Sequence, residues 1–146
     1  RSLVHRDLQS KNVMLRAGEA YLIDFQGLRE GTAFYDLGSL LFDPYVPFTR
    51  AERTALLRSY YDLGASLPWE AFDVAFHQAA VQRLMQALGA YGFLGLRQGK
   101  PHFLSYVPPG MVNLRQAAEA AGGLHRLRAL LARIEAEAPR SLGLKG

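Results

Sequence analysis

The sequence HRDLQSKN, residues 5–12, is followed closely by LIDFQ, residues 22–26. Between these two motifs, apolar runs at residues 13–15 and 21–23 flank the turn-forming segment RAGEA. Apolar runs on either side of a glycine-containing turn are typical of a β-hairpin. One small hairpin can therefore bring the side chains of both motifs together.

Three side chains in these motifs suit phosphoryl transfer. That reaction needs a carboxylate to orient the attacking hydroxyl and metal ions to bridge the nucleotide phosphates. Asp7 can supply the carboxylate. Magnesium prefers oxygen ligands, which the Asn12 amide and the Asp24 carboxylate provide. Each of the three would be an ordinary cap or turn residue if it stood alone, but together they predict a catalytic Asp7 and a magnesium site at Asn12 and Asp24.

The two motifs resemble those of the protein-kinase-like superfamily and, within it, the aminoglycoside phosphotransferase family. The kinase catalytic-loop pattern is matched at His5, Arg6, Asp7, Leu8 and Asn12, and the metal-binding DFG at Asp24 and Phe25. This resemblance implies ATP and Mg²⁺ as cofactors, Asp7 as the catalytic base, and Asn12 and Asp24 as the magnesium ligands. It also implies that Asp36, in FYDLGSLL, braces the catalytic loop from the next helix.

The remainder of the chain has helical apolar spacing. Helices are predicted from residue 33 to a stop at Pro44 and Pro47, over residues 49–63, from residues 67–69 to the glycines near Tyr91, and over residues 124–138, with a loop at 98–110. The length of 146 residues suits a single domain. The resemblance implies an α+β, mainly α fold over residues 1–146. That fold is the C-terminal lobe of a protein-kinase-like structure, in which a small β-hairpin carries the catalytic and metal-binding loops.

Two elements of a complete kinase-like site are not found in this sequence. It has no glycine-rich phosphate loop and no strand-borne Lys with a Glu partner. In the family these belong to an N-terminal lobe, so we expect the nucleotide-binding lobe to be absent from this chain. The cofactor-binding residues therefore stay unassigned. The isolated fragment is expected to be inactive and to self-associate through the apolar face that the other lobe would cover.

Composition limits the partners and the compartment. The formal charge of +4 comes from Lys and Arg spread through the chain, and we expect no nucleic-acid partner. There is no cysteine, which excludes disulfides and thiolate chemistry and fits a reducing cytoplasm. The longest apolar stretch, residues 87–96, is about half of a bilayer span. We therefore expect a cytoplasmic protein without a membrane partner.

Departures from the protein-kinase pattern narrow the substrate. Only residues 27–33 separate DFQ from the next predicted helix, which leaves no room for a regulated activation segment. A peptide substrate is therefore not expected. Gln9 stands where protein kinases place a basic residue, so that source of charge neutralisation is either missing or supplied from elsewhere. We expect a small hydroxyl compound as the acceptor.

Among small-molecule kinases, the sequence resembles bacterial anomeric kinases of N-acetylmuramate or N-acetylglucosamine. DFQ, YDLGSLLFDPY (residues 35–45) and ALGAYGFLGLRQGKPHFLSYVP (residues 87–108) carry this resemblance. After Asp43 the chain has seven acidic and twelve basic side chains, a balance that suits a neutral or acidic sugar better than a polycation. The alternatives are an aminoglycoside or choline-type kinase, or an inactive kinase-like interaction module that lacks its nucleotide lobe.

Overall fold

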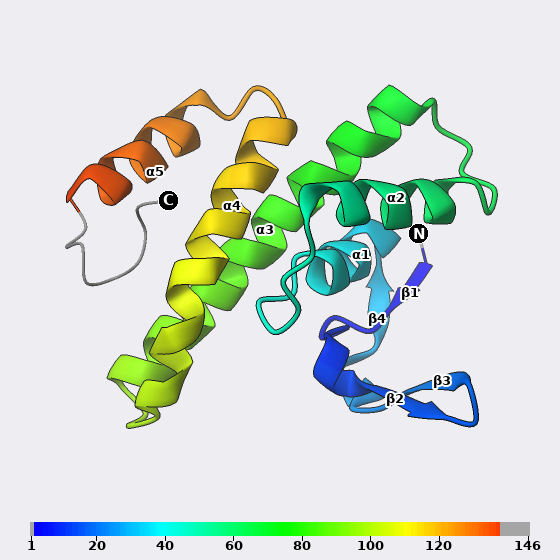
Figure 1. Ribbon diagram of the computed structural model, residues 1–146, viewed down its shortest axis with the longest axis horizontal. Coiled ribbons are helices and arrows are strands. Elements are labelled where there is room, and N and C mark those ends of the chain that lie inside the picture. Colours follow the sequence, from blue (N-terminus) through cyan, green and yellow to red (C-terminus); the bar gives the residue numbers. More distant parts are fainter. Residues whose placement is uncertain (1, 138–146) are drawn as a thin grey trace.

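The computed structural model describes residues 2–137 (Figure 1). In chain order the elements are β1 (Ser2–Val4), the short 3-10 helix η1 (Ser10–Asn12), β2 (Val13–Arg16), β3 (Glu19–Leu22), η2 (Phe25–Gly27), β4 (Arg29–Gly31), α1 (Ala33–Leu41), α2 (Arg50–Tyr61), α3 (Trp69–Leu96), η3 (Pro101–Tyr106), α4 (Val107–Ala120) and α5 (His125–Glu137). The predicted α+β, mainly α class is confirmed.

Two antiparallel strand pairs form the β part of the fold. Strands β2 and β3 make the predicted hairpin, with Val13 opposite Leu22 and Arg16 opposite Glu19. Ala17 and Gly18 connect them with φ angles of 52° and 83°, the left-handed conformation of a tight hairpin turn. Strands β1 and β4 form the second pair. It was not predicted, because strands of three residues are too short to give a periodic pattern.

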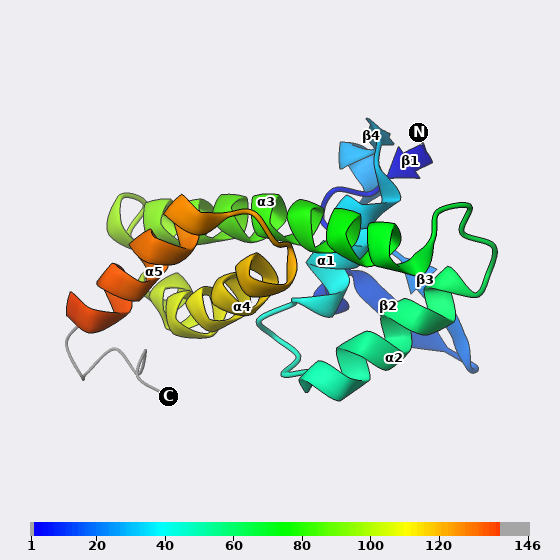
Figure 2. The same ribbon diagram turned by 90° about the horizontal axis from the view of Figure 1, so that it is seen from above.

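Helix α3 is the central element of the core. Figure 2 shows the strands, α1 and α2 around its N-terminal half and α4 beside its C-terminal half, and α5 packs against α4. Side chains from every helix meet along α3 in one apolar cluster. Its buried members are Leu41, Phe42, Leu57, Phe72, Phe76, Ala80, Val81, Leu84, Met111, Leu114, Ala117, Ala118, Ala121 and Leu131. This cluster makes α3 a rigid support for any side chain that it carries.

The strand region contributes little to this core and leaves large apolar side chains in solvent. These are Leu3, Met14, Leu15, Tyr21, Leu22, Ile23, Phe25 and Leu28. Leu15 is 77% exposed and Phe25, within the DFQ motif, is 61% exposed. We call this set the strand face. An apolar surface of this kind is typical of a region that another protein segment covers.

The helices predicted after residue 33 and after Thr49 are confirmed as α1 and α2. Thr49 and Glu52 form a capping box at the start of α2. Hydrogen bonds from Thr49 hold the pKa of the Glu52 carboxyl below its usual value. The closing helix is confirmed as α5, although the last residue of its predicted range, residue 138, lies outside the described residues.

The prediction that the long helix ends near Tyr91 was wrong, because α3 continues to Leu96. Glycine usually weakens a helix, but here tertiary contacts outweigh that preference. A Cβ at Gly95 would lie 2.5 Å from Leu104, so the glycine permits close contact between α3 and η3. Tyr91 is buried and its ring stacks against Phe103 of η3.

The predicted loop at residues 98–110 was also largely wrong. It contains η3 and the beginning of α4, a helix that the sequence analysis missed. Pro108 and Pro109 suggested a loop, but both lie in the first turn of α4. Backbone N–H groups there have no partner within the helix, so proline costs little. Within residues 2–137, no helix is both long enough and apolar enough to span a membrane.

Candidate active site

The catalytic-loop motif runs from the end of β1 through η1. Its backbone is held by Asp36 of α1, whose two carboxylate oxygens accept hydrogen bonds from the backbone N–H groups of His5, at 2.6 Å, and Arg6, at 2.8 Å. Arg6 has a φ of 72°, a left-handed conformation that is rare for this residue type. Such conformations persist where surrounding contacts enforce them. Asp36 therefore has the bracing position that the family resemblance implied.

A second carboxylate holds the same loop and was not identified from the sequence. Asp43 follows α1 and is 1% exposed. It accepts hydrogen bonds from the backbone N–H groups of Ser10, at 2.6 Å, and Tyr45, at 2.9 Å. The only local signal in the sequence was an acidic residue between the apolar Phe42 and Pro44. A carboxylate that is buried in such surroundings needs hydrogen-bond donors. Both ends of the loop are thus fixed to α1 and the segment after it.

The two carboxylate oxygens of Asp7 have different surroundings. Oδ1 accepts hydrogen bonds from Gln9 Nε2, at 2.5 Å, and from Arg83 Nη2, at 3.1 Å. Among the described residues, the only hydrogen bond to Oδ2 is a long one of 3.4 Å from Asn12 Nδ2. The same Asn12 nitrogen donates to the backbone carbonyl of Asp7 at 2.9 Å. Oδ2 is therefore the oxygen that remains able to accept a proton from a bound hydroxyl.

Two hydrogen bonds to the backbone of the preceding residue, Ile23, fix the position of Asp24. The backbone N–H of Ile23 donates to the carbonyl of Asn12 at 3.0 Å, and the carbonyl of Ile23 accepts from His5 Nε2 at 2.9 Å. The chain then turns sharply at Asp24, which has a φ of 62°. Gln26 donates a hydrogen bond to Asp24 Oδ1. His5 therefore holds the end of the hairpin.

Asp7 and Asp24 line one cleft of about 560 Å³. Its lining comes from the catalytic loop, the DFQ segment, the segment after α1, α3 and η3. It consists of His5, Arg6, Asp7, Gln9, Asp24, Gln26, Gly27, Tyr45, Arg83, Gln86, Ala87, Ala90, Tyr91, Leu94 and Phe103. Asn12 contacts Asp7 but is not part of this lining. No hydrogen bond within residues 2–137 joins Asp24 to the side chain of Asp7 or Asn12. The structure thus brings Asp7 and Asn12 into contact and places Asp24 on the same cleft.

Arg83 of α3 is the site residue that the sequence analysis missed. Its side chain is 10% exposed and forms an ion pair with Asp7, whose side chain is 49% exposed. The nearby phenol of Tyr91 is also buried, and this burial raises its pKa further above the physiological range. The sequence offered one signal, a basic side chain among the apolar positions of a helix. The separation of Arg83 from the motif hid its role.

The oxygen atoms present fit a magnesium ion of the kind used in phosphoryl transfer. Asn12 uses its amide nitrogen to bond Asp7, which leaves its carbonyl oxygen as a possible ligand. Asp24 keeps Oδ2, which accepts no hydrogen bond from the described residues. No group of three His, Cys, Asp or Glu side chains suited to a metal occurs in residues 2–137. Magnesium in such sites usually takes one or two protein carboxylates and completes its shell with phosphates and water, so this small donor set is compatible with it.

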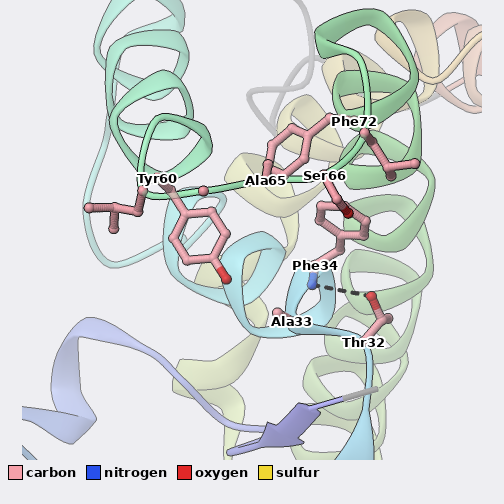
Figure 3. Close-up of a pocket in the computed structure, with 10 residues that line it drawn as sticks. Thr32, Ala33, Phe34, Tyr60, Ala65, Ser66 and Phe72 are labelled. Atoms are coloured by element: carbon pink, nitrogen blue, oxygen red, sulfur yellow. Dashed lines mark hydrogen bonds between the residues drawn. The ribbon is translucent and has the colours of Figure 1, made fainter.

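A separate pocket of about 490 Å³ lies between the start of α1, the end of α2 and the start of α3 (Figure 3). Phe34, Tyr60 and Phe72 point toward it, and the hydroxyl of Thr32 accepts a hydrogen bond from the backbone N–H of Phe34 at 3.4 Å. Its lining contains no carboxylate, amine, guanidinium or imidazole. It therefore lacks the groups that phosphoryl transfer needs, and the cleft at Asp7 is the candidate active site.

Comparison with known proteins finds similarity to phosphotransferases. Residues 1–72, which include the catalytic loop, the hairpin, DFQ and α1, match the model of a family described as the phosphotransferase enzyme family. The resemblance to aminoglycoside phosphotransferases that the motifs indicated is therefore confirmed.

Relatives with a more specific name cover most of the chain. N-acetylmuramate/N-acetylglucosamine kinase from Neisseria meningitidis is 34% identical over 88% of the chain and 40% of its own length. The proteins of the same name from Pseudomonas aeruginosa and Pseudomonas putida are 32% and 30% identical over 90% and 93% of the chain, respectively. The chain thus spans about two fifths of the length of these curated relatives.

Proposed function

We propose that this chain is the catalytic lobe of an ATP- and Mg²⁺-dependent phosphotransferase that acts on a hydroxyl of an amino sugar, of the N-acetylmuramate or N-acetylglucosamine kind. The observation that carries the proposal is the cleft lined by Asp7 and Asp24, with Asn12 bonded to Asp7. A protein-kinase-like C-terminal lobe is the fold we assign to residues 1–146. The braced loop and the hairpin are the features that support it.

In this proposal Asp7 is the catalytic base. Oδ1 is already bonded by Gln9 and Arg83, so Oδ2 is the atom that orients the acceptor hydroxyl and takes its proton. Phosphoryl transfer has a loose transition state, and the main task of the protein is to hold the reacting groups in line. The carboxylate therefore needs a fixed direction more than a high basicity. The hydrogen bonds of Asp7 and the bracing of its loop by Asp36 favour this role.

Asn12 and Asp24 are the proposed magnesium ligands. They would hold the ion through the Asn12 side-chain carbonyl and the Asp24 carboxylate; Asp24 lines the cleft and Asn12 is hydrogen-bonded to Asp7 beside it. The bound ion would neutralise charge on the nucleotide phosphates. The contribution of the chain is to fix the two ligands, and the bonds of Ile23 to Asn12 and His5 do this for Asp24.

We further propose that most contacts to the nucleotide come from residues outside 1–146. The basis is that this sequence contains neither a glycine-rich loop nor a strand-borne Lys–Glu pair. Residues 1–146 alone should then bind ATP very weakly. Calorimetry that gave micromolar ATP affinity for this chain would overturn that division of the site.

The residues in the cleft favour a sugar over a cationic acceptor. Among the described lining residues, only Asp7 and Asp24 are acidic, and both have assigned roles. A polycationic aminoglycoside would need further carboxylates. The ammonium of Lys11 lies 3.6 Å from the centre of the Tyr45 ring, so a cation already occupies that aromatic face and choline would compete with it. The names of the three relatives point the same way.

The test is a panel of acceptors assayed at the full natural length of the protein, with release of ADP as the readout. We expect turnover with N-acetylmuramate or N-acetylglucosamine and none with an aminoglycoside or choline. A methyl glycoside of the active sugar should not react, because the anomeric hydroxyl is blocked. Turnover of the aminoglycoside alone would refute the sugar assignment but leave the phosphotransferase assignment intact. The interaction-module alternative requires that no acceptor reacts.

A further inference from the structure

Arg83 is a charged side chain in a buried position, where the loss of hydration is unfavourable. It lies on α3 among the buried residues Ala80, Leu84 and Ala87, and the whole residue, backbone included, is 8% exposed. A buried guanidinium loses much of its hydration, and an ion pair often recovers no more stability than apolar residues of similar size would give. The stability of the core therefore does not by itself account for an arginine at this position.

Two hydrogen bonds fix the guanidinium in one orientation. Nε donates to the hydroxyl of the buried Ser39 at 3.1 Å, and Nη2 donates to Asp7 Oδ1 at 3.1 Å. The ring of Tyr35 lies 5.9 Å from the guanidinium carbon, within the range of a cation–π contact. Among the described residues, Asp7 is the only carboxylate that pairs with Arg83. Its charge is thus directed at one atom of the cleft.

The carboxylate that Arg83 holds is in the opposite situation. The Asp7 side chain is about half exposed and stands on a loop, where a free carboxylate would rotate between several orientations. Gln9 also donates to Oδ1, but it belongs to the same loop and moves with it. Arg83 belongs to α3, the most extensively packed helix. Among the described residues, Arg83 is the only hydrogen-bond donor to the Asp7 carboxylate that comes from outside the catalytic loop, so it ties the direction of this carboxylate to the rigid core.

We propose that Arg83 is a positioning residue for the base: it holds Asp7 by Oδ1 and leaves Oδ2 directed at the acceptor hydroxyl, with Ser39 fixing the guanidinium. This inference rests on the proposed function of Asp7. It also identifies a source for the positive charge that the catalytic loop lacks, since Gln9 stands where protein kinases have a basic residue. Here the charge comes from a helix on the other wall of the cleft.

A double-mutant cycle at the full natural length of the protein tests this role. The proteins are wild type, Asp7→Asn, Arg83→Gln and the double variant, compared by kcat, by KM for ATP and the acceptor, and by urea unfolding. Arg83→Gln should lower kcat about 10- to 100-fold, because a small misplacement of a reacting group is costly, while each KM changes less than about 3-fold. In the Asp7→Asn background the same change should lower kcat less than about 3-fold, because the base is already removed.

Three further variants keep the test decisive. Arg83→Lys retains the charge and should recover part of the lost turnover. Ser39→Ala keeps the arginine but removes the hydroxyl that anchors it. This variant replaces Arg83→Gln in the cycle if Arg83→Gln does not fold. The loss of kcat caused by Ser39→Ala should also vanish in the Asp7→Asn background. Arg53→Gln is the matched control, since Arg53 is half-buried on α2 and bonds Asn113 and Gln116. It should lower the unfolding midpoint without lowering kcat.

The outcomes separate this inference from the function on which it rests. If Arg83→Gln reduces kcat by the same factor with and without Asp7, the residue acts only through the fold and the proposal is overturned. If Asp7→Asn itself leaves kcat unchanged, the assigned base is wrong, and the proposed role of Asp7 fails together with the inference.

Discussion

Carboxylates with different tasks meet at the catalytic loop. Asp36 and Asp43 accept backbone hydrogen bonds and hold the loop in place, whereas Asp7 is left with one carboxylate oxygen open to the cleft. A backbone held in this way can maintain the left-handed conformation of Arg6, which the loop alone would not favour. The chemistry assigned to Asp7 therefore depends on neighbours that do not line the cleft.

The buried Asp43 provides a test of this bracing. Asp43→Asn should reduce the free energy of unfolding by roughly 1–3 kcal/mol, because the new amide directs N–H groups at backbone donors and leaves a buried group unsatisfied. Urea unfolding measures the effect. Asp62→Asn, at a side chain that is 62% exposed, is the control and should change stability little. A loss below about 0.5 kcal/mol at Asp43 would show that the loop does not depend on this carboxylate.

Asp24 gives a different signature, because its proposed role is at the metal. Asp24→Asn should weaken the dependence on magnesium, so that half-maximal turnover requires a higher concentration of the ion and extra magnesium restores part of the rate. Gln26→Ala removes the hydrogen bond to Asp24 but keeps the carboxylate, and it should shift the dependence less. Unchanged magnesium dependence in Asp24→Asn would refute the ligand assignment, whereas no turnover with any acceptor and no effect of Asp24→Asn on metal binding would favour the interaction-module alternative.

At the scale of elements, the hairpin has one unfavourable residue. Ala17 adopts a φ of 52° in the turn between β2 and β3, a conformation that asparagine and glycine tolerate better. Ala17→Asn produces the Asn-Gly pair preferred in such turns and should stabilise the protein by about 0.5–1 kcal/mol. Thermal unfolding measures the gain. Ala20→Asn, in strand β3, should not reproduce it. A loss of stability in Ala17→Asn would mean that the turn is formed differently.

Local sequence patterns predicted the elements whose signals are themselves local. The hairpin, the capping box at Thr49 and the amphipathic α5 all follow from neighbouring residues. Helix α4 was missed because Pro108 and Pro109 indicate a loop unless the position of the helix start is known. The length of α3 was underestimated for a related reason. Its glycines are accommodated by contacts with η3, which no local pattern contains.

The candidate site, like the fold, was predictable from the sequence only where the signal is local. Asp7, Asn12 and Asp24 lie in short motifs, and the sequence analysis identified them as candidates. Arg83 lies 76 residues from Asp7 and Asp43 lies 33 residues from Ser10, so their contacts emerge only from tertiary packing. The bracing role of Asp36 came from the family resemblance and not from any pattern in its surroundings.

On the scale of the whole molecule, the strand face predicts how residues 1–146 behave alone. Exposed apolar side chains on the strands should make the chain associate as its concentration rises. Light scattering measures the mass. The double variant Leu15→Ser, Phe25→Ser should reduce association, whereas Leu63→Ser, at a residue that is 84% exposed on the α2–α3 connection, should not. A monomer at high concentration would contradict the view that another segment covers the strand face.

The central claim is that Asp7 is the base of a phosphoryl-transfer site, and Asp7→Asn at the full natural length of the protein tests it most directly. Nucleotide affinity and sugar turnover are measured on the same sample, with ADP release as the readout. We expect nearly unchanged ATP binding and a kcat lower by about 10²- to 10⁴-fold, the range typical of a lost general base. An Asp7→Asn protein that turns over the sugar at the wild-type rate would contradict the claim.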